Sequence, residues 1–320
     1  MADRLEFPDG KRFAFTILDD TDVATTANVM PIYRLLESLG MRTTKTVWPV
    51  GCPEGSPNFS TSDTLEDAEY RAFVVDLQRR GFEIASHGAT MESSPRERTL
   101  AALARFRELF GADPKVHANH SYNRENVYWG LARIDDPILR LMYRRTNGRP
   151  PGWYEGDRPG SPWWWGDVCA ERISYVRNLT FDTLNLATIN PSMPYHDPKR
   201  PLVRWWFSST DAESVTEFNR LLEPARVSAL EREGGYCIVA THLGKGFVQG
   251  GEVHPLTRQR LEALASRPGW FCTTGELLDF LRERRTGSGL PSAEWRRMQW
   301  RWATDLMTRR IAGRWRRKTA

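Results

Sequence analysis

Strand-like and helix-like segments alternate along the chain, and this alternation restricts the fold more than any other feature of the sequence. The strand-like segments are short and apolar, and the helix-like segments carry apolar residues at three- to four-residue spacing. In the first half they are, in order, 13–18, 28–39, 42–48, 65–80, 82–86, 95–110 and 115–118. The alternation returns at 235–241, 255–265, 270–272 and 274–285. It predicts an α/β fold in which helices cover a parallel sheet.

The region between these two parts is less regular. Residues 121–224 contain long stretches rich in Gly, Pro and Trp, and we expect strands there only at 173–176 and 179–186. With 320 residues, of which 40% are apolar, the chain is long enough for one large domain with a full core. We therefore expect the middle region to be an elaborated part of the same domain.

Carboxylates and imidazoles directly follow four of the predicted strands. They are Asp19, Asp20 and Asp22 after the first strand, then His87, then His117 and His120, and finally His242. In a parallel α/β barrel the carboxyl ends of all strands open on one face, and the active site lies there. The shared position predicts a hydrolytic site that uses a metal ion or a carboxylate–imidazole pair.

The three acids after the first strand support this prediction. Neighbouring carboxylates that lose their water repel each other, so they are tolerated where a cation lies between them or where one keeps its proton. A solvated turn is the alternative, because Asp and Thr are common in turns.

These strand ends resemble motifs of the NodB-type polysaccharide deacetylases (carbohydrate esterase family 4). A strand that ends in two aspartates matches 17–20, a Gly-x-Glu-Ile strand that ends in His matches 81–87, and a late apolar strand that ends in His matches 237–242. The resemblance implies a distorted (β/α) barrel, usually of seven parallel strands. We expect this NodB-like barrel domain over residues 1–285 and a basic C-terminal helix over 286–320.

The resemblance also implies a role for each matched residue. Asp19 would be the general base, and Asp20 and His87 would bind a divalent metal ion, for which we expect zinc. His242 would be the general acid that protonates the leaving amine.

The chain departs from the family at two places. The family's second metal-binding histidine lies four residues after the first, and here that position is Met91, whose soft thioether suits such a site poorly. The family's third motif is replaced by 117–121. A catalytic zinc commonly has three protein ligands. We expect His120 to be the third, with Glu92 and then Asp22 as the alternatives.

The activity implied is the removal of an N-acyl group from a saccharide or a sugar conjugate. Two alternatives stay open: a metal-independent amidohydrolase of the same superfamily, and a barrel without catalysis that binds saccharides or protein partners. We expect substrate contacts from His117, Asn119, Trp164 and Trp165, since aromatic rings can stack on sugars. For His117 and the tryptophans, packing in the core is the alternative.

The positive charge of the chain belongs to its last segment. Residues 286–320 hold nine Arg or Lys and two acids, a balance of +7, whereas the whole chain carries +5, which leaves −2 for the remainder. Nucleic-acid binding by the barrel is therefore not expected. Within 293–318, Trp295, Met298, Trp302 and Leu306 recur at helical spacing. This pattern predicts a membrane-surface helix, a partner-binding helix, or a helix that packs one face on the body.

The expected location is the cytoplasm. The first residues lack the apolar run of a signal peptide, and no stretch approaches the roughly 20 apolar residues of a membrane span. Any attachment to the inner face of the membrane would depend on the tail.

Overall fold

Strand β1 (Phe13–Asp19) is the centre of the sheet in the computed structural model. The structure describes residues 5–59, 61–146, 149–285 and 287–319, and for 310–319 it describes the backbone only. Strand β1 pairs in parallel with β2, β7 and β10, and it is buried along its whole length. The pairing of β1 with β7 closes a barrel of seven parallel strands within the described residues. The other six strands of the barrel are β2 (Thr44–Val47), β3 (Glu83–Ser86), β4 (Val116–His117), β5 (Tyr175–Phe181), β6 (Trp205–Asp211) and β7 (Tyr236–Thr241).

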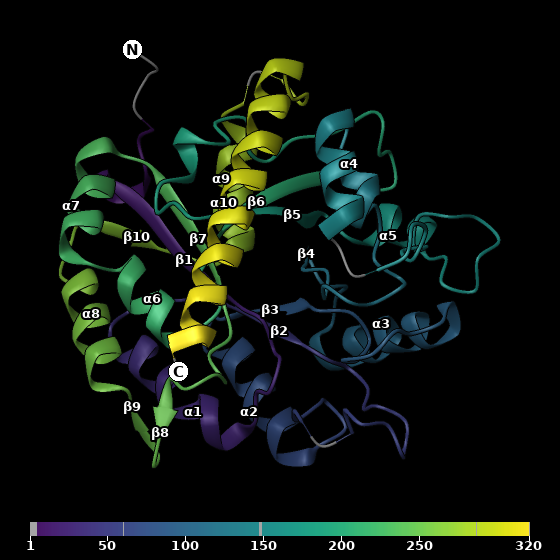
Figure 1. The fold of residues 1–320 in the computed structure, drawn as a ribbon. Helices are drawn as coiled ribbons and strands as arrows, with labels where there is room; N and C mark the ends of the chain where they lie inside the picture. Colours follow the sequence, from purple (N-terminus) through teal and green to yellow (C-terminus); the bar gives the residue numbers. More distant parts are fainter. Residues whose placement is uncertain (1–4, 60, 147–148, 286, 320) are drawn as a thin grey trace.

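Helices surround this barrel, as the α/β alternation predicts (Figure 1). In chain order they are α1 (Thr26–Ser38), α2 (Ala68–Arg79), α3 (Arg96–Phe110), α4 (Pro137–Thr146), α5 (Gly166–Arg172), α6 (Val215–Leu221), α7 (Pro224–Glu233), α8 (Pro255–Ala265), α9 (Thr274–Glu283) and α10 (Ser292–Thr319). Short 3-10 turns occur at η1 (Pro8–Gly10), η2 (Gly130–Arg133) and η3 (Leu186–Thr188). Strand β10 (Gly269–Phe271) pairs with β1, and β8 (Val248–Gln249) and β9 (Glu252–Val253) form a hairpin.

Local sequence signals set the ends of these helices. Helix α1 starts at a capping box, in which Thr25 and Asn28 satisfy each other's backbone N–H groups. Helix α3 ends at Gly111, which has a φ of +79° that glycine adopts without strain. The expected helix boundaries lie within a few residues of the observed ones.

The middle region supplies two barrel strands, and here the sequence prediction needs correction. One strand, β5, spans the gap between the two that we expected at 173–176 and 179–186. Strand β6 was not predicted, because its second half is rich in hydroxyl side chains. Two of these hydroxyls find partners inside the fold: Ser208 Oγ accepts a hydrogen bond from Asn190, and Thr210 Oγ1 donates to the carbonyl of Thr183.

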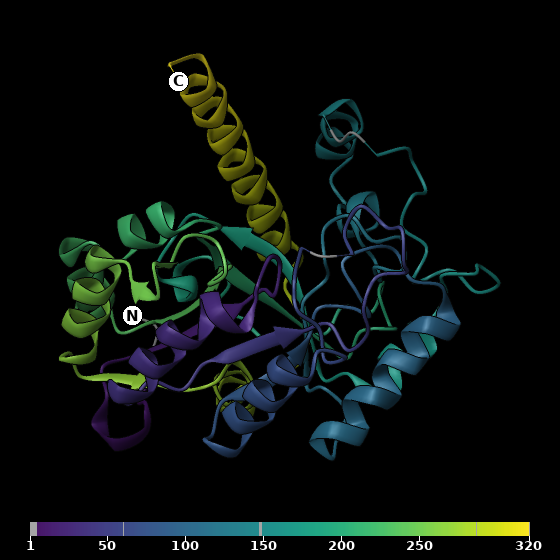
Figure 2. The same ribbon diagram turned by 90° about the horizontal axis from the view of Figure 1, so that it is seen from below.

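Helix α10 packs one face on the barrel domain. Trp295, Met298 and Trp302 are buried in the same apolar cluster as residues of β5 and β6. Trp295 Nε1 also donates a hydrogen bond to Asp135 Oδ2 (3.0 Å). The apolar stripe is therefore covered by the protein itself, in agreement with the prediction that the helix packs one face on the body. The C-terminal end of α10 extends away from the rest of the chain (Figure 2).

Among the described residues, no helix combines the length and the apolar composition needed to cross a lipid bilayer.

Met298→Ala is expected to lower the free energy of unfolding by about 2–5 kcal/mol, because it leaves a cavity under α10. Met307→Ala is the matched control on the same helix: Met298 is 0% exposed and Met307 is 46% exposed. The control should change stability by less than about 0.5 kcal/mol. Urea unfolding followed by tryptophan fluorescence measures both. Equal effects of the two substitutions would contradict the docking of α10.

Candidate active site

A cavity of about 510 Å³ lies at the carboxyl ends of the barrel strands. Its wall includes five of the residues that the sequence singled out: Asp20, Asp22, His87, His120 and His242. They follow β1, β3, β4 and β7, so the parallel topology brings together side chains that are far apart in the sequence.

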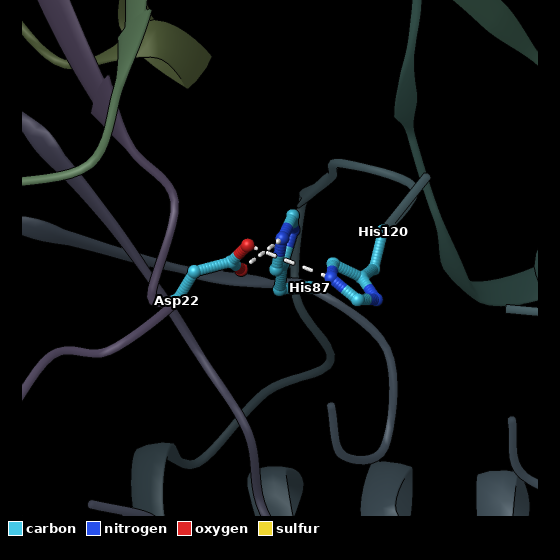
Figure 3. Close-up of side chains that lie close together, drawn as sticks. All are labelled: Asp22, His87 and His120. Atoms are coloured by element: carbon cyan, nitrogen blue, oxygen red, sulfur yellow. Dashed lines mark hydrogen bonds and ion pairs between the residues drawn. The ribbon is translucent and has the colours of Figure 1, made fainter. Parts of the chain in front are cut away.

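Asp22 is the centre of this group. Its Oδ1 lies 3.2 Å from His87 Nε2, and its Oδ2 lies 3.5 Å from His120 Nε2 and 3.4 Å from His242 Nε2. Figure 3 shows the first two imidazoles directed at the carboxylate. One ligand atom from each of Asp22, His87 and His120 lies within 4.8 Å of the other two.

The tautomer of each histidine follows from its second nitrogen. In all three rings Nδ1 faces an oxygen that accepts a hydrogen bond, so Nδ1 carries the proton. The acceptors are the Ala118 carbonyl for His87 (2.8 Å), Asn123 Oδ1 for His120 (3.0 Å) and the Glu213 carbonyl for His242 (3.2 Å). In the neutral form of each ring, the lone pair of Nε2 is therefore directed at the carboxylate of Asp22.

This convergence of acceptors fits a divalent metal ion. Neutral imidazoles and a carboxylate offer only lone pairs to one another, and a cation or an added proton must lie between them. The donor set of one carboxylate and two imidazoles suits zinc and similar ions. The hydrogen bonds at Nδ1 also have the arrangement that orients histidine ligands in metal sites. Asp22, His87 and His120 are the residues that would hold the ion.

The charges of the group affect its pKa values strongly. Burial alone would raise the pKa of Asp22, but the adjacent imidazoles of His120, His242 and His87 outweigh it and hold that pKa well below its usual range. For His120 and His242 burial alone lowers the pKa, and the nearby Asp22 and Asp20 carboxylates raise it above the ordinary value. The protonation of Asp22, His120 and His242 is thus coupled.

Asp20 forms a buried, bidentate ion pair with Arg177 on β5. The guanidinium donates from Nη1 to Oδ1 (3.0 Å) and from Nη2 to Oδ2 (2.7 Å). Burial alone would raise the pKa of Asp20, but the adjacent Arg177 lowers it below the usual value. Asp20 is therefore a carboxylate held ionised at the cavity wall, 3.8 Å from His87 Nδ1.

Asp19 lies outside the cavity wall and is 0% exposed. Lys45 Nζ (2.8 Å) and the Tyr33 hydroxyl (2.9 Å) donate to its Oδ2, and the Leu243 amide (2.8 Å) donates to its Oδ1. These contacts tie β1 to β2, to α1 and to the loop that carries His242. The structure thus gives Asp19 a supporting position behind the site, and the cavity-facing carboxylates are Asp20 and Asp22.

The expected third ligand, His120, lies in the cluster, and Asp22 lies at its centre. Met91 and Glu92 make other contacts: Met91 Sδ accepts a hydrogen bond from Thr61, and Glu92 accepts one from Ser56 (2.6 Å). His120 is held in turn through Asn123, whose amide donates to Glu125. Burial raises the pKa of Glu125 to about 7.

Only one of the four expected substrate contacts lines the cavity, and it is Asn119. His117 is buried between Ser86 and Asn119 and packs on Trp165, and burial lowers its pKa to about 3. Trp165 donates its indole N–H to the Glu125 carbonyl (2.6 Å) and belongs to the core. For His117 and Trp165, core packing is what the structure shows. Trp164 does not line the cavity either.

Several residues of the cavity wall were not predicted from the sequence. They are Arg177 on β5, Trp129 and Arg133 at η2, and Trp302 on α10. For Arg177 a signal existed, since it is a charged residue in the apolar strand Tyr175–Phe181. For the others no local pattern marks a site.

Comparison with solved structures finds an allantoinase, a probable deacetylase and an esterase among the similar chains. Puue allantoinase shares 13% identity, with 90% of this chain and 96% of that chain covered and a TM-score of 0.49. A probable polysaccharide deacetylase from Pseudomonas aeruginosa PAO1 shares 14% identity over 89% of this chain and 96% of that chain, with a TM-score of 0.48. A family 4 acetyl xylan esterase from Clostridium thermocellum, in complex with a cobalt ion, shares 14% identity over 87% of this chain and 98% of that chain, with a TM-score of 0.37.

No protein-family model and no curated protein sequence matches the chain. The fold therefore rests on the observed strand pairing, and the chemistry has to follow from the side chains of the cavity.

Proposed function

We propose that the protein is a metal-dependent hydrolase that cleaves an amide bond and removes an N-acyl group from a saccharide or a sugar conjugate. One observation carries the proposal: the lone pairs of Asp22, His87 and His120 converge in the same cavity as an ionised Asp20 and His242. Hydrolysis of an unactivated amide is catalysed by a metal ion together with a general base and a general acid, and this cavity has candidate residues for all three.

The base in this proposal is Asp20 and not Asp19. Asp20 lines the cavity, and Arg177 keeps its carboxylate ionised, so that it can accept a proton from an attacking water. Asp19 already accepts hydrogen bonds from Lys45, Tyr33 and Leu243 and faces away from the cavity. The metal-binding carboxylate is correspondingly Asp22.

His242 is the acid. Its Nδ1–H is bound to the Glu213 carbonyl, so Nε2 faces Asp22 and the cavity. When protonated there, it can pass a proton to the nitrogen that leaves as the acyl–nitrogen bond breaks. A bound divalent ion would supply the polarisation of the acyl oxygen.

Metal removal tests the proposal. Protein treated with a chelator and then with zinc is assayed for acetate release from N-acetylglucosamine and its β-1,4-linked oligomers. We expect chelation to lower the rate by at least about 10²-fold, the scale of one lost electrostatic stabiliser, and zinc to restore it. Full activity of zinc-free protein would favour the metal-independent amidohydrolase. Zinc binding without hydrolysis of any probe would favour the barrel that only binds.

A further inference from the structure

Arg133 is a buried cation in the wall of the cavity. It ends the 3-10 turn η2 and is 7% exposed. Its guanidinium lies over the ring of Trp129 (3.9 Å to the centroid) and over that of Trp302 on α10 (4.7 Å). Two indoles therefore lie against the guanidinium, and its N–H donors remain for polar partners.

The polar partners of these donors are neutral. Nη1 donates to the Asn178 carbonyl at 3.3 Å, and the Tyr143 hydroxyl is close enough for a hydrogen bond. Nε is buried and has no hydrogen-bond partner among the described residues. Burial lowers the pKa of Arg133, yet an arginine keeps its charge in a protein. An uncompensated charge of this kind is costly to bury.

The other cations of the wall already have carboxylate partners. The pairs are Arg177 with Asp20, Lys245 with Glu213, and Arg309 with Asp211. Among the described residues no carboxylate pairs with Arg133. The cavity therefore holds one cation whose counter-charge is not supplied by the part of the chain that the structure describes.

We propose that Arg133 binds an anionic group of the substrate, so that the preferred substrates are N-acyl amino sugars that carry a carboxylate or a phosphate. This proposal takes one element from the proposed function, namely that the substrate carries an N-acyl group. A guanidinium edge offers parallel N–H donors that match both kinds of anion. The cavity of about 510 Å³ lies within the range of roughly 300–1,000 Å³ typical of small-molecule sites.

The indole contacts also give Arg133 a structural use, since they join η2 to α10. Packing alone, however, does not need a charge, and it would not make the protein distinguish an anionic sugar from a neutral one. Preference between such sugars is therefore the readout that separates the two roles.

The test measures equilibrium binding of sugars that cannot be hydrolysed because they lack the acyl group. Calorimetry on the zinc-loaded full chain compares glucosamine, which has no anionic group, with muramic acid, which adds a carboxylate, and glucosamine 6-phosphate. We expect at least one anionic sugar to bind roughly 10- to 100-fold more tightly than glucosamine, as for a charge-assisted bidentate contact. The sugar that shows the preference identifies the anion as a carboxylate or a phosphate.

Two variants assign the preference to Arg133. Arg133→Gln and Arg133→Met should both abolish it, and the unbranched Met side chain can remain packed between the two indoles if Gln does not fold. Lys245→Gln removes a charge from the same wall and should retain the preference. The proposal is overturned by equal binding of all three sugars, by no binding of either anionic sugar, or by a preference that persists without Arg133 or disappears without Lys245.

Hydrolysis of the N-acetylated forms of these sugars, assayed on the same preparations, tests the proposed function separately. A protein with an Arg133-dependent preference that hydrolyses none of them would retain this proposal and lose the proposed function. A protein that hydrolyses these sugars without an Arg133-dependent preference would retain the proposed function and lose the proposal for Arg133.

Discussion

Asp20→Asn is expected to lower kcat by about 10²–10⁴-fold, because the amide cannot accept the proton of the attacking water. The zinc content should stay near that of the wild type, since Asp22, His87 and His120 are retained. The substitution leaves Arg177 without its carboxylate, so kcat has to be expressed per folded molecule.

Asp19→Asn is the matched control and should show the opposite pattern. It leaves Lys45 buried without its partner, and loss of one member of a buried ion pair costs about 3–5 kcal/mol of unfolding free energy. The kcat of the molecules that remain folded should change far less than in Asp20→Asn. Urea unfolding and steady-state rates on both variants give the comparison. If Asp19→Asn lost turnover without losing stability while Asp20→Asn kept its activity, the base would be Asp19.

His120→Ala is expected to lose zinc and activity together. Changes to groups that only orient a ligand already cost 10- to 100-fold in metal affinity, so removal of a ligand should cost more than that. Elemental analysis after dialysis against a fixed free zinc concentration measures the loss.

Met91→Leu is the control for that experiment and should keep both zinc and activity. Met91 contacts Thr61 and is not among the residues of the metal cluster. Zinc retained by His120→Ala would move the third ligand to another side chain at the cavity, with His242 beside Asp22 as the first to test.

The fold could be read from the sequence because its elements are set locally. Apolar strands such as Phe13–Asp19 and capped helices such as Thr26–Ser38 carry their signals within a few residues. The meeting of His87, His120 and His242 was also predictable, since parallel strands place their carboxyl ends on one face.

Which of two neighbouring aspartates faces the cavity could not be read in this way. Successive side chains of a strand point to opposite sides, and at the end of β1 it is Asp20 that lines the cavity while Asp19 does not. The register decides between them, because it sets Asp19 beside Lys45 on β2. A lysine inside the buried strand Thr44–Val47 was the one available hint that Asp19 has a partner elsewhere.

Arg177 and Arg133 were missed for a related reason. The contact of Arg177 with Asp20 joins residues 157 positions apart, and Arg133 is defined by Trp302 on the last helix. Pairings over such distances leave no periodic trace in the sequence.

The order in which the polypeptide is made gives α10 a further meaning. Every strand of the barrel, up to β7 at Thr241, leaves the ribosome before Trp302 and Leu306 do. Since domains fold as they emerge, the nascent barrel can assemble Asp22, His87 and His120 while the side of the cavity that α10 covers is still open to solvent. A growing chain would thus acquire its metal ligands first and its substrate wall last, which leaves the cluster accessible to ions during synthesis.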